Sequence, residues 1–137
     1  GKCLLIRRAK EPYKGYWAIP GGKLEWKDLP IENPTRMNGD VIDFENAVED
    51  LLKREVLEEA GIEIKDDFRY INSVAFIRPD GIPVVLVKFA VKYKSGDVKL
   101  EERAFSDFAW VNELEVWDYD CIEGIEDEIK KTVEIFS

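Results

Sequence analysis

Runs of apolar residues alternate with polar turns along the chain and predict several strands. Residues 3–8 are apolar and then basic, which is typical of a strand. Two longer runs, 70–78 and 83–93, flank the turn sequence Arg78-Pro79-Asp80-Gly81, so we expect a β-hairpin there. Residues 107–111 form one more short apolar run. The pattern therefore predicts strands at the start, in the middle and late in the chain.

Two other segments carry apolar residues at the spacing of an amphipathic helix. The first begins at Asp43, which can cap a helix, and ends at Gly61, with apolar positions at Phe44, Val48, Leu51, Leu52 and Val56. The second lies near the C-terminus, with apolar positions at Ile122, Ile125, Ile129, Val133 and Phe136. Residues 26–42 contain prolines and little periodicity, so we expect an irregular insertion there. The mixture indicates an α/β (α+β) fold class.

The composition narrows the classes of protein that these elements can form. The 137 residues suit one domain, and they include 20 Lys and Arg against 29 Asp and Glu, a formal net charge of −9. This acidic balance argues against nucleic acid as a partner. No apolar run approaches the ~20 residues that a membrane span needs. Histidine is absent, so histidine-based catalysis is excluded.

The two cysteines point to a reducing compartment. Cys3 and Cys121 are far apart in the sequence and form no CxxC motif. Two cysteines are too few for a disulfide framework, so we expect reduced thiols. A cytoplasmic protein is the corresponding expectation.

Three glutamates gather on one flank of the first predicted helix. At about 100° per residue, Glu58 and Glu59 both lie within about 60° of Glu55. Like charges at this spacing repel each other, and the last turn of a helix disfavours anions. A divalent cation such as Mg2+, which prefers carboxylate oxygens, would compensate for the crowding. A solvated acidic face on a surface helix is the alternative interpretation.

Two adjacent glycines, Gly21 and Gly22, precede this helix and are followed by Lys23. Glycines let the backbone approach a ligand or metal closely, and Lys23 adds a charge suited to phosphate. Arg8 is a second candidate for binding phosphate, and Trp17 is a candidate for stacking on a nucleobase. The plainer alternatives are a simple turn for the two glycines, a solvated strand end for Arg8 and core packing for Trp17. Together with the glutamates, these residues indicate a phosphate–metal site.

The segment that follows Lys53 resembles the second half of the Nudix hydrolase signature. The signature reads G-x5-E-x7-R-E-U-x-E-E-x-G-U, where U is a bulky aliphatic residue. Its second half is matched by Arg54, Glu55, Val56, Glu58, Glu59, Gly61 and Ile62. The likeness extends to Trp17–Gly22, which resembles the W-x-x-P-G-G approach of the family, and to residues 4–8 and 108–111, which resemble two of its strands.

The first half of the signature departs from the family pattern. Counted from Gly22, the position of the first glutamate is held by Asp28, and 25 residues separate Asp28 from Arg54 where the signature has seven. A second alignment through Gly39 and Glu45 leaves eight residues before Arg54. We prefer the first alignment because it keeps the Pro-Gly-Gly loop of the family. Whether Asp28, Glu45 or neither replaces the first glutamate stays open.

The resemblance implies a Nudix fold, in which a mixed β-sheet lies in an α/β/α sandwich. It implies one domain over residues 1–137, with an insertion at about 26–42. The implied activity is hydrolysis of a nucleoside diphosphate linked to another moiety, with ADP-ribose or a nucleoside triphosphate as the expected substrate. The products would be a nucleoside monophosphate and a second phosphorylated compound, and the cofactor Mg2+ or Mn2+. The alternative is a non-catalytic module that binds or senses a nucleotide; a homodimer is left open.

The resemblance also assigns the metal ligands. Glu55 and Glu59 are the principal ligands, and Glu58 is a further ligand, directly or through water. The carbonyl oxygen of Gly21 resembles the ligand that the loop supplies in the family. Glu55 and Glu58 are also expected to take part in catalysis.

Other motif positions have expected roles. The general base is left open between the helix glutamates and the later polar loop that holds Glu101 and Glu102. Of these two acids, Glu102 is the expected catalytic residue. Arg54 would orient Glu58 or Glu59, and Gly22 and Gly61 would be structural residues of the motif.

Overall fold

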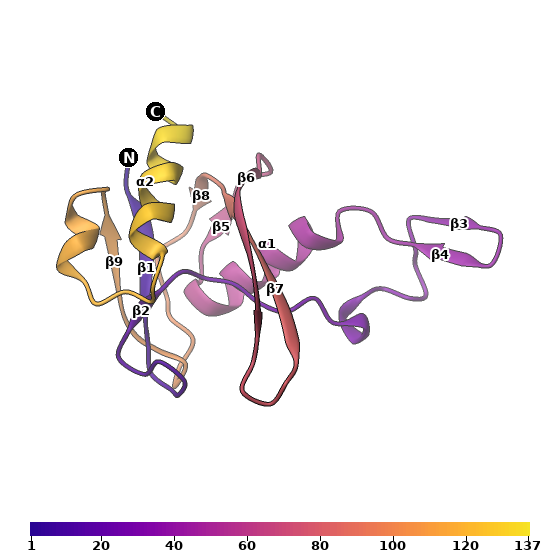
Figure 1. The fold of residues 1–137 in the computed structure, drawn as a ribbon. Coiled ribbons are helices and arrows are strands. Elements are labelled where there is room, and N and C mark those ends of the chain that lie inside the picture. Colours follow the sequence, from indigo (N-terminus) through magenta and orange to yellow (C-terminus); the bar gives the residue numbers. More distant parts are fainter.

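The computed structural model describes all 137 residues, and a three-stranded sheet lies in the body of the protein (Figure 1). Strand β1 (Cys3–Arg8) pairs antiparallel with β2 (Trp17–Ala18) on one side and with β9 (Phe105–Val111) on the other. The strand predicted at residues 3–8 is confirmed, and β9 contains the one predicted at 107–111.

The two predicted helices are present, with different first residues. Helix α1 spans Ala47–Ala60, and α2 spans Ile125–Ile135. Gly61 ends α1 as predicted, because it adopts the left-handed conformation with φ at 72° and its N–H donates to the carbonyl oxygen of Leu57 at 2.9 Å. A side chain there would also collide with Lys99, whose backbone oxygen would lie 3.0 Å from a Cβ atom.

Residues of β1 alternate between two hydrophobic clusters. Leu5 belongs to a cluster with Ile129 of α2, whereas Leu4 and Ile6 belong to a cluster with Val56 of α1. Successive side chains of a strand point to opposite faces of a sheet, so the two helices cover opposite faces of this one. The expected α/β/α sandwich is confirmed. Burial of each such side chain contributes about 1.5–3 kcal/mol to folding.

The sheet was expected to combine parallel and antiparallel pairing, and only one contact of its strands is parallel. All pairings between the strands of the sheet are antiparallel. The parallel contact is an isolated bridge between Trp17 of β2 and Cys121.

The segment expected to be irregular is partly regular. It contains a 3-10 turn, η1 (Trp26–Asp28), and a small hairpin of β3 (Arg36–Asn38) and β4 (Val41–Asp43). We call residues 29–46 the insertion arm, because Figure 1 shows this segment extending away from the sandwich beyond the start of α1. The expectation that residues 26–42 are irregular was therefore wrong in part, and that they form an insertion stays a prediction.

The predicted start of the first helix was also wrong. Asp43 ends β4, where it pairs in register with Arg36 and accepts a hydrogen bond from its Nε at 2.6 Å. The N-cap position of α1 is held by Asn46. A carboxylate already engaged within the hairpin does not act as a helix cap, and the capping motif in the sequence could not show this competition.

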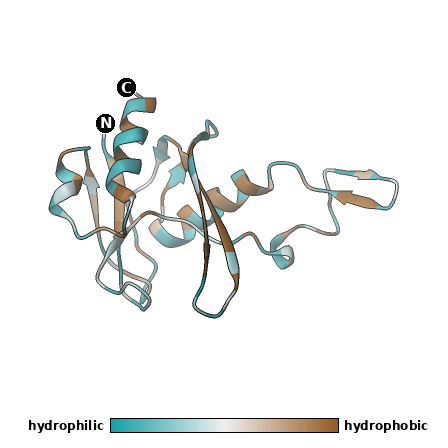
Figure 2. Cartoon of the chain, viewed as in Figure 1, coloured by the Kyte–Doolittle hydropathy of each residue, from teal (hydrophilic) through white to brown (hydrophobic).

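The predicted central hairpin is confirmed as β6 (Arg69–Ile77) and β7 (Pro83–Ala90). Figure 2 shows that both strands are largely hydrophobic, and many of their side chains are exposed. Two short strands, β5 (Glu63–Ile64) and β8 (Tyr93–Ser95), form a further antiparallel pair, and a 3-10 helix, η2 (Glu115–Asp118), follows β9. Neither α1 nor α2 has the length and apolar composition needed to cross a membrane.

Candidate active site

The last two turns of α1 carry the three clustered glutamates. Val56 and Ala60 are buried in the core cluster beneath the sheet, which sets the rotation of the helix. In this orientation the side chain of Glu55 is only 20% exposed, whereas that of Glu58 is 57% exposed. Glu59 is half-buried. The predicted grouping of the carboxylates on one flank of a helix is therefore present.

The glycine loop contacts two of these glutamates. The backbone N–H of Gly21 donates a hydrogen bond to Oε2 of Glu59 at 3.3 Å. Gly22 lies against Glu55, where a Cβ atom would come within 2.4 Å of the Glu55 carboxyl carbon. The contacting residues are 33 (Gly22 and Glu55) and 38 (Gly21 and Glu59) positions apart in the sequence, so the fold itself brings together the two halves of the predicted site.

Arg54 contacts carboxylates from two different elements. Its guanidinium lies 3.4 Å from Asp28 in η1, 3.7 Å from Glu55 and 3.9 Å from Glu58. It makes no ion pair with Glu59. Arg54 thus contacts Glu58, one of the two glutamates that it was expected to orient, and this orienting role stays a prediction. The contacts of Arg54 with Glu55 and Asp28 were not expected.

The electrostatic environment of Glu59 is unfavourable for a carboxylate. The pKa of Glu59 is raised to about 7, chiefly by burial and also by the negative charges of Glu55 and Glu101, while the Gly21 hydrogen bond and the charge of Arg8 oppose the increase. Burial followed by the charge of Glu58 also raises the pKa of Glu55. Because Glu59 forms no ion pair, its charge has no contacting cation to balance it.

The chemistry of this donor set fits a divalent cation. Carboxylate oxygens are the ligands that Mg2+ and Mn2+ prefer, and a half-buried carboxylate without a partner gains most from a nearby positive charge. Glu55, Glu58, Glu59 and the backbone of Gly21 would provide the ligands. The fit rests on the chemistry of these donors and not on their present geometry, because no three acidic or cysteine side chains in the structure converge into a group that could hold a metal ion.

The three residues expected to bind substrate have different surroundings. Arg8 donates from Nε to the carbonyl oxygen of Pro12 at 2.8 Å, and its charge acts on the pKa of Glu59. Lys23 is exposed and forms no ion pair, so its ammonium group is available to a ligand. Trp17 packs edge-to-face on Tyr119, with ring centroids 4.9 Å apart, beside the core cluster of Leu5. These contacts are those of a core residue, and the expected stacking of Trp17 on a nucleobase stays a prediction.

The polar loop before β9 approaches the glutamates through its backbone. The N–H of Glu101 donates to the carbonyl oxygen of Glu59 at 3.0 Å, and the charge of Glu101 raises the pKa of Glu59. Glu102 is exposed in the following turn, and its side chain makes no hydrogen bond or ion pair. Glu101 therefore has the closer electrostatic relationship to the site, although Glu102 was the expected catalytic residue; its role stays a prediction.

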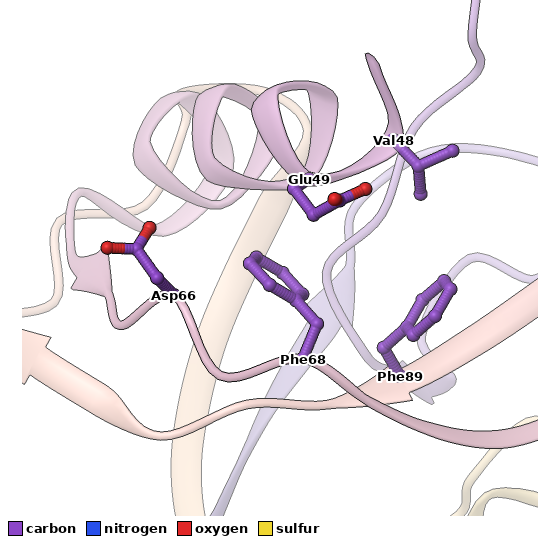
Figure 3. Close-up of a pocket in the computed structure, with 5 residues that line it drawn as sticks. All are labelled: Val48, Glu49, Asp66, Phe68 and Phe89. Atoms are coloured by element: carbon purple, nitrogen blue, oxygen red, sulfur yellow. The ribbon is translucent and has the colours of Figure 1, made fainter. Parts of the chain in front are cut away.

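A separate cavity of about 270 Å³ lies at the first turn of α1 (Figure 3). Five residues line it: Phe68 and Phe89, whose rings pack edge-to-face on each other, the acids Glu49 and Asp66, and Val48. None of the residues predicted for the site lines this cavity. The cavity is therefore distinct from the glutamate flank, which lies at the opposite end of the helix.

The fold and the glutamate–glycine arrangement define a protein of the Nudix class. The model of the family described as NUDIX domain matches residues 1–131, and the chain belongs to this family. The expected enzyme class, a hydrolase that acts on phosphorus-containing anhydrides, is thereby confirmed at the level of the family. No curated protein matches the chain.

Several solved structures are similar to this chain. A MutT NUDIX hydrolase from Burkholderia pseudomallei has a TM-score of 0.65 and 22% identity, covering 95% of this chain and 87% of that one. The NUDIX domain of NrtR from Shewanella oneidensis, in complex with ADP ribose, has a TM-score of 0.69 and 17% identity, with coverages of 99% and 78%. An Ap4A hydrolase from C. elegans has a TM-score of 0.62 and 16% identity, with coverages of 98% and 85%. At these identities, the similarity establishes the fold.

Proposed function

We propose that this protein hydrolyses the pyrophosphate bond of a nucleoside diphosphate linked to another moiety, in a reaction that depends on Mg2+ or Mn2+. The observation that supports the proposal is the state of Glu59. The Glu59 carboxylate is half-buried, no cation contacts it, and its pKa is raised to about 7. It accepts a hydrogen bond from the Gly21 N–H, and the nearby charge of Glu55 contributes to the raised pKa. Such an arrangement is costly in a protein without a ligand and is explained by a divalent cation.

The bound cation would neutralise the charges of the pyrophosphate and lower the pKa of a coordinated water. Glu55 and Glu59 would be its principal ligands, with Glu58 and the carbonyl oxygen of Gly21 as further ligands. Arg54 holds Glu55 and Glu58 by its ion pairs. Gly22 gives Glu55 the space that its side chain occupies.

Other residues of this chain would bind the substrate and move the proton. Arg8 and Lys23 supply positive charge for the phosphates. A carboxylate takes the proton from the attacking water as the bond between phosphorus and the bridging oxygen breaks. The helix glutamates are candidates for this base, together with Glu101 and Glu102; the electrostatic coupling of Glu101 to Glu59 supports Glu101.

ADP-ribose and nucleoside triphosphates are the proposed substrates. The resemblance of the chain to family members that act on these compounds supports them, as does the ADP ribose bound in the Shewanella oneidensis structure. The test is a panel of nucleoside diphosphate derivatives, including Ap4A, incubated with Mg2+, with Mn2+ or with EDTA, and analysed for a nucleoside monophosphate. Release only in the presence of metal supports the proposal, and its absence across the panel contradicts it.

The alternative function is a module that binds a nucleotide without cleaving it. The departure of the first half of the signature, with Asp28 in place of glutamate, is the observation that favours it. Calorimetric binding of ADP-ribose in Mg2+, without product after hours, would distinguish this module from an enzyme.

Three further expectations concern the whole protein. We propose that residues 1–137 form one NUDIX domain with an insertion at about 26–42, and that the protein acts in the cytoplasm. The homodimer also stays a prediction, for which light scattering of the purified protein is the measurement.

A further inference from the structure

Asp28 ends the η1 turn and contacts helix α1. Its Oδ2 lies 3.4 Å from a terminal nitrogen of Arg54, and its side chain is 31% exposed. Asp28 forms no other ion pair. It also lies close enough to Glu55 for its charge to influence that carboxylate. The η1 turn is therefore connected to the glutamate flank through one side-chain contact.

Arg54 is the shared partner in a chain of carboxylates. The guanidinium is planar and offers several N–H donors in a rigid arrangement, so it can hold acids on more than one side. On α1 alone, its contact with Glu58 would be an exposed pair four residues apart, and such pairs constrain a side chain only weakly. Asp28 approaches the guanidinium from a different element. A guanidinium held from two directions has less freedom than one held by its own helix alone.

The other candidate for the missing signature acid has a different partner. Oε2 of Glu45 lies 3.4 Å from a terminal nitrogen of Arg36, and Arg36 also pairs with Asp43. The backbone N–H of Glu45 donates to Oγ1 of Thr35 at 2.9 Å. Glu45 therefore closes the insertion arm on itself and has no ion pair with Arg54.

We propose that Asp28 is a positioning residue of the active site, which fixes the Arg54 guanidinium and thereby holds Glu55 and Glu58 in place to receive a divalent cation. The inference rests on the proposed function, because it concerns the same cation. The proposed role also explains how the site tolerates an insertion. Asp28 lies before the insertion arm, so the additional residues leave its contact with Arg54 intact.

The direct test measures Mn2+ binding by electron paramagnetic resonance, without substrate. We expect Asp28→Asn to weaken Mn2+ affinity about tenfold, the usual scale for losing a residue that orients metal ligands. Asp28→Glu keeps the carboxylate and should retain at least half of the wild-type affinity. Glu45→Gln is the matched control in the insertion arm and should bind Mn2+ like the wild type. Circular dichroism establishes that each variant is folded.

Two further measurements separate positioning from a general loss of structure. In an Arg54→Gln background, Asp28→Asn should cause no additional loss of Mn2+ affinity, because the two residues act in series. In steady-state assays, Asp28→Asn should lower kcat about tenfold while KM for the nucleotide changes less than threefold.

The outcomes distinguish this inference from the proposed function. If the wild type binds Mn2+ and hydrolyses a nucleotide while Asp28→Asn matches it in both, Asp28 has no positioning role and the proposed function stands. An equal loss of Mn2+ affinity with and without Arg54 also overturns the inference. If the wild type neither binds Mn2+ nor hydrolyses any nucleotide, both proposals are overturned.

Discussion

Gly22 and Glu55 lie so close together that no side chain fits between them. A Cβ atom at Gly22 would stand 2.4 Å from the carboxyl carbon of Glu55 and 2.8 Å from its Oε2. By contrast, a Cβ atom at Gly21 would meet nothing within 4 Å. The two adjacent glycines therefore differ in what they require: Gly22 is needed for space, and Gly21 contributes a backbone N–H.

This difference predicts opposite effects of two matched substitutions. We expect Gly22→Ala to weaken Mn2+ binding by about tenfold or more, because the added methyl group would displace the carboxylate of Glu55, an expected metal ligand. Gly21→Ala has open space for its methyl group and should change the affinity less than about twofold. Isothermal titration with Mn2+ measures both. Equal affinities for the two variants would contradict the assignment of Gly22.

The glutamate site should reduce the stability of the metal-free protein. The folded state raises the pKa of Glu59 from 4.5 to about 7, so it binds the Glu59 proton more tightly than the unfolded chain does. The resulting stabilisation is complete below about pH 4.5 and is lost as the pH rises through 7. Glu59→Gln removes the charge, and we expect this variant to exceed the wild type in unfolding free energy by about 1–3 kcal/mol at pH 8 in EDTA.

Urea denaturation at pH 8 and at pH 4.5 provides the measurement, because the advantage of Glu59→Gln should be confined to the higher pH. The same variant should lose turnover by about a hundredfold, since several kcal/mol of charge stabilisation by the cation is lost with one ligand. A variant that is less stable than the wild type at pH 8 would contradict the account of Glu59.

The site helix was predictable from the sequence because its signals are local. Helical spacing placed three carboxylates on one flank of α1, and Gly61 marked its end. The start of the helix was not predictable, because Asp43 is a good capping residue in isolation and its competing partner, Arg36, belongs to a hairpin. Strands as short as β3 and β4, which have three residues each, offer too few positions for an alternating hydrophobic pattern to be recognised.

Contacts between distant segments were beyond the sequence for a different reason. Asp28 and Arg54 are separated by 25 residues, so the sequence left open whether Asp28, Glu45 or neither replaces the first glutamate of the signature, although the alignment through Asp28 was preferred. Only the fold shows that Asp28 contacts Arg54 while Glu45 contacts Arg36. The contact of Trp17 with Tyr119 likewise depends on the fold, because the two lie 102 positions apart in the sequence, and the predicted role of Trp17 in substrate binding stays a prediction.

The two thiols should react slowly in the folded protein. Burial raises the pKa of Cys3 from 9.0 to about 11, and burial together with nearby acids raises that of Cys121 to about 11. At pH 8 each thiolate population should therefore be about a hundredfold lower than in the unfolded chain, and the thiolate is the reactive species. Iodoacetamide labelling followed by mass spectrometry, with and without urea, measures the ratio. Equal rates in both conditions would show that burial does not suppress ionisation.

The insertion arm should be removable without loss of the metal site. The backbone N–H of Thr35 donates to the carbonyl oxygen of Asp43 at 2.9 Å, so the two ends of the hairpin lie together. None of the side chains in β3 or β4 is buried, and Arg36 forms its ion pairs within the arm. We expect replacement of residues 36–43 by two glycines to leave Mn2+ affinity within about twofold of the wild type, because Asp28 precedes the deletion and keeps its contact with Arg54.

The same deletion combined with Asp28→Asn should lower Mn2+ affinity as much as Asp28→Asn does in the complete chain, about tenfold. Titration of the four proteins with Mn2+, after thermal melts have shown each to be folded, completes the comparison. If the deletion alone weakened binding as strongly as Asp28→Asn, the arm itself would help to hold the η1 turn, and Arg54 would not depend on Asp28 alone. If the deletion and Asp28→Asn each weakened binding and the double variant lost more affinity than either alone, the helix glutamates would have two separate supports.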